Sequence, residues 1–209
     1  MTKLLISILL AAAAAFGQYK VEPAGPAPAE LSSAIRQAMQ KDGIKVLGAG
    51  GAVVCELWFR TTSPGGPKST EQDVTLPAMP QGALLGAIRF TAKGSDRRGQ
   101  SIKPGVYTLR YAVQPMNGDH QGVAPQRDFA LAVPAANDKS LDAISGFDDL
   151  VKASEMASGT PHPAVFSIWK DDQPSSAPSI AKQGDSDWAV HVKVGDLPVA
   201  MIVVGAYQG

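Results

Sequence analysis

Apolar and polar residues alternate with a period of two along most of the chain after residue 43. Between residues 106 and 114 the odd-numbered positions are apolar or aromatic, and the even-numbered positions mix apolar, polar and charged side chains. Residues 53–60 and 188–194 show the same alternation. A strand with this pattern packs one face on a core and exposes the other to water. The chain therefore predicts antiparallel sheet with one buried and one solvated face.

Turns rich in glycine and proline divide the chain into strand-sized segments. Residues 44–60 predict two strands joined by a tight turn at 49–51. Residues 71–76 predict a weaker strand at a sheet edge. The other predicted strands are residues 84–92, 105–114, 128–133, 164–170, 187–194 and 199–207.

Two segments break the alternation and predict short helices. In residues 29–43, apolar side chains recur every four positions until a glycine ends the pattern, and residues 146–159 predict a second, inserted helix. Residues 18–29 contain three prolines and predict a flexible leader. About nine strands and two helices predict an all-β fold, a single antiparallel β-sandwich of immunoglobulin-like or jelly-roll type over residues 30–209.

The first 17 residues have the parts of a secretory signal peptide. Lys3 supplies the positive start, residues 4–16 form a short apolar run, and small residues precede a cleavage point at Gly17/Gln18. No later run approaches the roughly 20 apolar residues that a membrane helix needs. We therefore expect a soluble protein in the periplasm or outside the cell, with no transmembrane segment in the mature chain.

Charge and cysteine content exclude several classes of function. The 19 basic and 19 acidic residues balance, and no basic cluster exceeds Arg97-Arg98, so nucleic acid is not an expected partner. Cys55 is the one cysteine, which rules out an internal disulfide, and its strand pattern predicts a buried apolar side chain. The sequence has no G-x-S-x-G, P-loop or G-x-G-x-x-G motif, so no catalytic residue is assigned.

The connection between residues 114 and 128 is the first candidate site. An Asn-Gly dipeptide and two prolines predict a turn, but Asp119, His120, Arg127 and Asp128 add polar chemistry that a turn does not require. These four residues predict a ligand site, because long polar loops on rigid scaffolds often bind. Alternatively, Arg127 pairs with Asp119 and braces the base of the loop. This structural role is the favoured interpretation.

A divalent-metal site is the second candidate, with hydrolysis as the activity it would support. Asp119, His120 and His162 would supply carboxylate and imidazole ligands for a cation such as zinc, if their two turns meet. No close histidine spacing marks such a site, and His191 is interpreted as an exposed strand residue. The two turns are residues 117–120 and 160–163.

Two other polar groups have structural interpretations. The mixed face of residues 53–60 carries Glu56, Trp58 and Arg60, which we expect to form a Glu-Arg pair beside a tryptophan that covers the sheet. The Asp-x-Asp motif at 185–187 is expected to be a solvated turn, because a calcium loop needs more ligands in a fixed order.

Residues 102–136, and the part GDHQGVAPQRDF above all, resemble a group of exported bacterial β-rich proteins of unknown function. The resemblance implies an exported β-rich domain over most of the mature chain, and it brings no activity and no catalytic residue. We therefore expect a non-catalytic binding or interaction module whose partner is a small ligand or an envelope or extracellular protein. The alternatives are the metal-dependent site and a structural component of the cell envelope.

Overall fold

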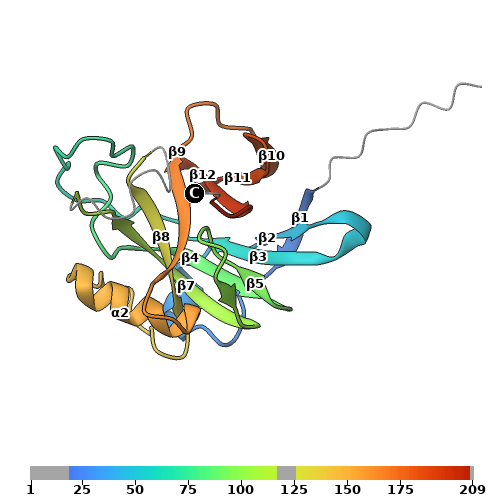
Figure 1. The fold of residues 1–209 in the computed structure, drawn as a ribbon, viewed down its shortest axis with the longest axis horizontal. Coiled ribbons are helices and arrows are strands. Elements are labelled where there is room, and N and C mark those ends of the chain that lie inside the picture. The colour runs from blue at the N-terminus through green and yellow to red at the C-terminus, as the bar shows by residue number, and fades with distance from the viewer. Residues whose placement is uncertain (1–18, 117–125, 208–209) are drawn as a thin grey trace, which may run out of the picture.

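The structure is a computed structural model that describes residues 19–116 and 126–207. Within these residues, ten strands form one antiparallel sheet in the order β1-β2-β3-β4-β7-β8-β9-β12-β11-β10 (Figure 1). They are β1 (Lys20–Gly25), β2 (Gly43–Leu47), β3 (Val53–Phe59), β4 (Leu84–Phe90), β7 (Gly105–Val113), β8 (Asp128–Pro134), β9 (Ala164–Lys170), β10 (Ser179–Gln183), β11 (Asp187–Val194) and β12 (Leu197–Val204).

The remaining elements are short. A two-stranded ribbon pairs β5 (Gly94–Ser95) with β6 (Ser101–Ile102), and a single 3-10 turn, η1 (Ala49–Gly51), joins β2 to β3. The helices are α1 (Ser33–Ala38) and α2 (Phe147–Ser158). Among the described residues no helix combines the length and apolar composition that a bilayer crossing requires.

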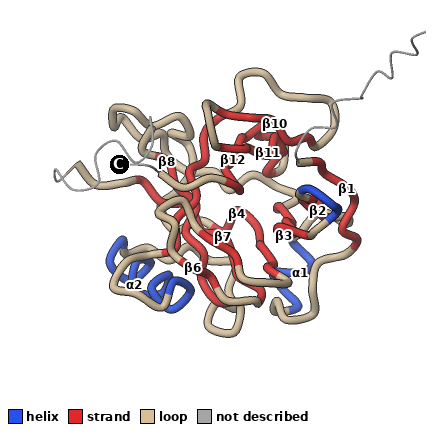
Figure 2. Tube along the Cα trace, turned by 45° about the vertical axis from the view of Figure 1, so that its right-hand side comes forward, coloured by secondary structure: helices blue, strands red, loops and turns tan. Residues whose placement is uncertain are grey.

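The large sheet curls until its outermost strands, β1 and β10, contact each other, so that its shape approaches a closed barrel (Figure 2). The ring of Tyr19, directly before β1, lies 5.0 Å from the ring of Trp188 on β11. The all-β prediction is therefore confirmed, but the structure does not show two packed sheets. Alternation predicts a buried face, and a curled sheet and a sandwich both provide one.

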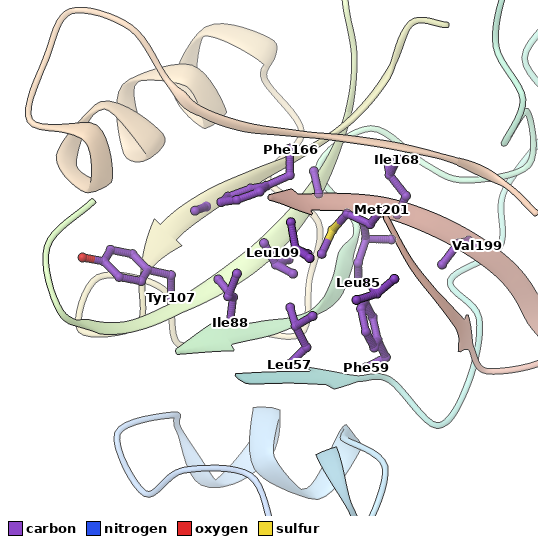
Figure 3. Close-up of a cluster of buried hydrophobic side chains, with 14 of the residues drawn as sticks. Leu57, Phe59, Leu85, Ile88, Tyr107, Leu109, Phe166, Ile168, Val199 and Met201 are labelled. Carbon is purple, nitrogen blue, oxygen red and sulfur yellow. The ribbon is translucent and has the colours of Figure 1, made fainter. Parts of the chain in front are cut away.

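The inner face of the curled sheet holds the main apolar core (Figure 3). Tyr107, Leu109 and Tyr111 of β7 all point into it, as the alternation predicts. Cys55 is also fully buried there, which confirms its predicted environment. The labelled core side chains in Figure 3 are Leu57, Phe59, Leu85, Ile88, Tyr107, Leu109, Phe166, Ile168, Val199 and Met201.

The outer face is buried too where the helices cover it, so the expectation of a solvated face is wrong for β3 and β7. Ile35 of α1 belongs to an apolar cluster with Trp58 of β3, and Leu150 of α2 belongs to another with Leu131 of β8. Over β11 the expectation is correct, because Lys193 is exposed on the outer face. Alternation reports which side chains share a face, but it does not report whether another element covers that face.

A buried ion pair lies on the outer side of β7. Arg110 has no exposed surface, and its Nε and Nη2 donate to the two carboxylate oxygens of Asp138 at 2.7 and 2.6 Å. The Arg110 guanidinium also donates to the carbonyl oxygens of Gly82, Ser140 and Asp142. One arginine thereby holds the segment after β8 against the sheet, with every bond charge-assisted.

Trp58 and Glu56 have partners that differ from the expected ones. Glu56 pairs with Arg89 on β4, and the expected partner Arg60 does not take part. The Arg89 guanidinium lies 5.5 Å from the centre of the Trp58 ring. Trp58 donates its indole hydrogen to the carbonyl oxygen of Gly25 at 2.8 Å, so it anchors the end of β1 rather than covering an open face.

Two edge assignments are also corrected. The predicted flexible leader, residues 18–29, contains β1, which pairs in register with β2 from Lys20 to Pro23. A proline is compatible with an edge strand, because its missing N–H can face solvent. The weak strand predicted at residues 71–76 is irregular in the structure.

Candidate functional site

The chain connection from β9 to β10 crosses two strands. β9 pairs with β12, and β10 lies two strands further along the sheet, so residues 171–178 must pass β12 and β11. The crossing starts with a backbone bond from the N–H of Asp171 to the carbonyl oxygen of Pro198, 3.1 Å long. We call residues 171–178 the crossing loop.

An imidazole-carboxylate pair fastens the crossing loop to the sheet. Val190 and Val192 point into the core, so His191, between them on β11, points outward. Its Nδ1 lies 2.8 Å from Oδ2 of Asp171. The side chain of Asp171 is only 6% exposed, whereas that of His191 is 21% exposed. An ionised carboxylate can only accept, so Nδ1 carries the hydrogen and Nε2 remains for another partner.

A pocket of about 190 Å³ lies beside this pair. We call it the crossing-loop pocket. The crossing loop contributes Asp171, Ser175 and Ser176, and β11 contributes His191 and Lys193. Gln40, before β2, also lines the pocket and donates to the carbonyl oxygen of Lys193 at 2.9 Å. Segments far apart in the sequence thus meet at one small hollow.

The polar groups in the crossing-loop pocket differ in their availability. Asp171 has both oxygens engaged, because Oδ1 accepts from the N–H of Gln173 at 3.0 Å and Oδ2 is held by His191. Lys193 is exposed and makes no ion pair with any residue that the structure describes. The groups available to a ligand are therefore Nε2 of His191, the Lys193 ammonium and the Ser176 hydroxyl, because the Ser175 hydroxyl donates to the carbonyl oxygen of Ala177.

An apolar pocket of about 440 Å³ lies close to the first. The two pockets share no residue, but Lys170 and Asp196 of the apolar pocket directly adjoin Asp171 and Gly195 of the crossing-loop pocket in the chain. Apolar walls come mainly from the β3–β4 connection and β12. These wall residues are Pro64, Leu76, Pro77, Ala78, Met79 and Leu197.

In the predicted loop site, Arg127 has hydrogen-bond partners within the protein. Arg127 donates to the carbonyl oxygen of Gln114 at 2.7 Å and to the carboxylate of Glu71 at 2.6 Å. It therefore braces the two ends of the connection, with Glu71 as its acidic partner. Asp119 and His120 lie outside the described residues, so the predicted Asp119 partnership and ligand role stay predictions.

Asp128 is fully buried and satisfies four donors. Its oxygens accept from the N–H and hydroxyl of Thr75 at 2.7 and 2.9 Å, from the N–H of Leu76 at 3.2 Å and from the hydroxyl of Tyr111 at 2.6 Å. Burial and the neighbouring carboxylate raise the pKa of Tyr111, which keeps its hydrogen for this bond. This carboxylate holds the β3–β4 connection to the sheet.

In the predicted metal site, His162 lies at the end of β8 that is opposite to Asp128. His162 directly precedes β9, and the start of β9 pairs with the end of β8 through Ala164 and Ala132. β7 ends at Val113 and β8 begins at Asp128, and these two residues pair with each other at the opposite end of the two strands. Among the described residues no cluster of three metal-ligating side chains occurs. Because Asp119 and His120 lie outside this part, the metal site stays a prediction.

Sequence reasoning missed the Asp171–His191 pair. Twenty residues separate the two, and the residue pattern marks His191 only as a polar position in a strand. Their proximity follows from β12, which is later in the chain and lies between β9 and β11. The one available signal was the pair of aspartates at 171 and 172, directly after a predicted strand.

No family model, curated protein or solved structure matches this chain. The resemblance to exported bacterial β-rich proteins stays a prediction from residues 102–136. The two pockets and the groups that line them are therefore the features that bear on function.

Proposed function

We propose that this protein is an exported, non-catalytic binding module that holds a small ligand in the crossing-loop pocket. The observation that carries the proposal is the imidazole of His191, which is oriented by a buried carboxylate and lines a pocket together with an unpaired lysine. Polar groups that converge on a hollow of a rigid scaffold are the usual elements of a ligand site.

A purely structural role explains the Asp171–His191 bond but not its surroundings. A brace for the crossing loop needs one hydrogen bond between loop and strand, and the pair provides it. It does not need an unpaired Lys193 in the lining of the same pocket. The binding proposal accounts for this ammonium, since Lys193 and His191 line the same pocket.

The proposal is tested by screening small polar compounds against the ¹⁵N-labelled protein with two-dimensional NMR. We expect compounds that bind to shift the amide signals of residues 191–195 and 171–178, and His191→Gln to abolish these shifts. Lys182→Gln is the matched control, because Lys182 is an exposed lysine of β10 that does not line the pocket. Binding that survives in His191→Gln and shifts other regions would place the site elsewhere.

Export is part of the same proposal and rests on the signal-peptide pattern of residues 1–17. Mass spectrometry of the protein from its native compartment should give an N-terminus at or near Gln18. The mature chain would then begin next to Tyr19, whose ring packs on Trp188. A chain that retains Met1 and stays in the cytoplasm would contradict export and leave the binding proposal unaffected.

One observation also favours hydrolysis as a second function. The Nε2 of a carboxylate-oriented imidazole can accept a proton from water, and Ser175 and Ser176 line the same pocket. Turnover of an activated ester that disappears in both His191→Gln and Asp171→Asn would support this activity. Turnover that both variants retain would exclude His191 as its general base.

A further inference from the structure

We infer that the crossing-loop pocket selects a small oxyanion and takes up one proton when the anion binds, an inference that rests on the proposed binding function. The pocket lining contains three titratable side chains, Asp171, His191 and Lys193, which come from the crossing loop and β11. Their charges and hydrogen bonds decide which ligand charge the pocket accepts.

Among the described residues, the one carboxylate in the pocket lining, Asp171, is already hydrogen-bonded to the protein. Asp171 is nearly buried, and each of its oxygens already accepts a hydrogen bond from Gln173 or His191, so its charge is turned toward the protein rather than toward a ligand. The next acidic residue, Asp172, lies outside the pocket lining and pairs with Lys170 at 3.2 Å. A cationic ligand therefore finds no open carboxylate among the described lining residues.

The positive charge, in contrast, is available. Lys193 extends from β11 two residues beyond His191, on the same outer face, and has no ion-pair partner in the described part of the chain. Ser176 and His191 line the same space, whereas the hydroxyl of Ser175 already donates to the carbonyl oxygen of Ala177. An ammonium with hydroxyl and imidazole donors is a set that matches carboxylate, sulfate or phosphate oxygens.

Proton uptake follows from the two nitrogens of His191. Nδ1 donates to Asp171, so Nε2 carries no hydrogen in the neutral ring and would repel an anion oxygen. When the ring is protonated, both nitrogens donate, and Nε2 can bind the anion while Nδ1 remains on the carboxylate. Anion binding thus favours the protonated ring, and affinity should be higher at a pH where both ring nitrogens carry hydrogen than at a pH where Nε2 has lost it.

The test measures the affinity of the mature protein for acetate, sulfate and acetamide by NMR at about pH 5.5 and pH 8. Sulfate keeps its charge across this range and acetate stays mostly ionised, so a tenfold change in affinity belongs to the protein. Acetamide has the shape of acetate without its charge. We expect acetate and sulfate to shift the pocket signals, with affinity about tenfold tighter at the lower pH, within the usual range of coupling between sites, and acetamide to have no effect.

Three variants complete the test. Lys193→Gln should weaken acetate and sulfate at both pH values, His191→Gln should remove the pH dependence, and Lys182→Gln should change neither. Lys193 is exposed, so its variant stays informative even if His191→Gln perturbs the crossing loop. Calorimetry in two buffers of different ionisation enthalpy should show uptake of protons with acetate.

The outcomes separate the inference from the function on which it rests. Acetamide that binds as well as acetate, or anion affinity that does not change with pH, would overturn the oxyanion inference and leave a binding pocket. If acetate, sulfate, acetamide and the wider compound screen all leave the pocket signals unchanged, both the inference and the proposed function are wrong.

Discussion

At the scale of single residues, Asp128 stabilises the fold more than any exposed charge can. It is a fully buried carboxylate with four hydrogen-bond donors around it, from the β3–β4 connection and from Tyr111. Removing such an acceptor leaves buried donors without a partner, and each of these costs about 1–3 kcal/mol. The carboxylate therefore acts as a common fastening for segments that are distant in sequence.

Asp128→Ala should lower the free energy of unfolding by about 3 kcal/mol or more, because several donors lose their acceptor together. Urea unfolding followed by circular dichroism measures this change. Asp172→Ala is the control and should cost less than about 1 kcal/mol, since Asp172 forms an exposed ion pair. Equal costs for the two variants would contradict the role of Asp128.

Cys55 gives a pH-dependent prediction. Burial raises the pKa of its thiol from the ordinary 9.0 to about 12, so the folded state keeps a proton that the unfolded state releases. Between these values the folded state binds more protons, and stability must fall as pH rises. The loss between pH 8 and pH 10.5 should reach about 2 kcal/mol, since one pKa unit corresponds to about 1.4 kcal/mol.

Cys55→Val tests this assignment. Urea unfolding under reducing conditions at both pH values should show a smaller alkaline loss in Cys55→Val than in the wild type. Each protein is compared with itself, so any packing change caused by valine cancels. An alkaline loss that is identical in both proteins would show that Cys55 does not carry this effect.

At the scale of elements, β7 is the strand whose environment differs most from its pattern. Thr108, Arg110 and Ala112 read as a mixed, solvated face, yet all three are buried on the outer side. Thr108 donates its hydroxyl to Asp138, which also holds Arg110. Both faces of this central strand are therefore sensitive to added charge.

Thr108→Asp should destabilise the protein severely, because it places a second carboxylate beside buried Asp138. Leu109→Asp should have a comparable effect on the inner face, where Leu109 is fully buried. Lys182→Asp on exposed β10 should change stability by less than about 0.5 kcal/mol. Thermal unfolding of the three variants gives the comparison, and a mild Thr108→Asp would restore the solvated-face interpretation.

Most strands were predictable because their alternation is strong and their turns are marked by glycine or proline. The hairpin at 44–60 and the strands β4, β7, β8, β9, β11 and β12 all form where the pattern places them. The two helices also form, although α1 is shorter than its pattern. The pattern failed at edges: β1 contains a proline, β10 is short and mostly exposed, and residues 71–76 lack a partner strand.

The candidate site could not be predicted in the same way. A strand's alternation assigns His191 to the outer face, but only the sheet order shows that Asp171 lies beside it. That order depends on β12, which forms a hairpin with β11 and also pairs with β9. No local pattern reports the β9–β12 pairing. A bracing role for Arg127 was predictable, since an arginine at the base of a long loop needs an acceptor. Its acidic partner, Glu71, was not predictable from the sequence.

At the scale of the whole molecule, the near-closure of the sheet depends on a small contact between its ends. Tyr19 and Trp188 pack with their rings tilted at 59°, and β1 touches β10 without pairing with it among the described strands. An aromatic pair of this kind adds about 0.5–1.5 kcal/mol beyond the area that it buries. The region where β1 meets β10 and β11 should therefore be the part of the barrel that opens first.

Tyr19→Ala should lower stability by about 1–2 kcal/mol and speed amide hydrogen exchange in β1 and β10, while exchange in β7 and β8 stays slow. Mass-spectrometric hydrogen exchange resolves these regions. Tyr207→Ala is a suitable control, because Tyr207 is 39% exposed and has no aromatic partner among the described residues. Faster exchange throughout the sheet would show that the closure stabilises the whole fold rather than its edges.

The position of β12 has a consequence for the timing of folding. Residues 197–204 are the last described strand to be synthesised, yet they lie between β9 and β11 in the middle of one half of the sheet. Until these residues emerge from the ribosome, the β10–β11 hairpin has no strand through which to join the rest of the sheet. The apolar inner face of the sheet therefore stays exposed until nearly the whole chain has been synthesised. Such late pairing of β12 with β9 delays completion of the sheet and slows folding.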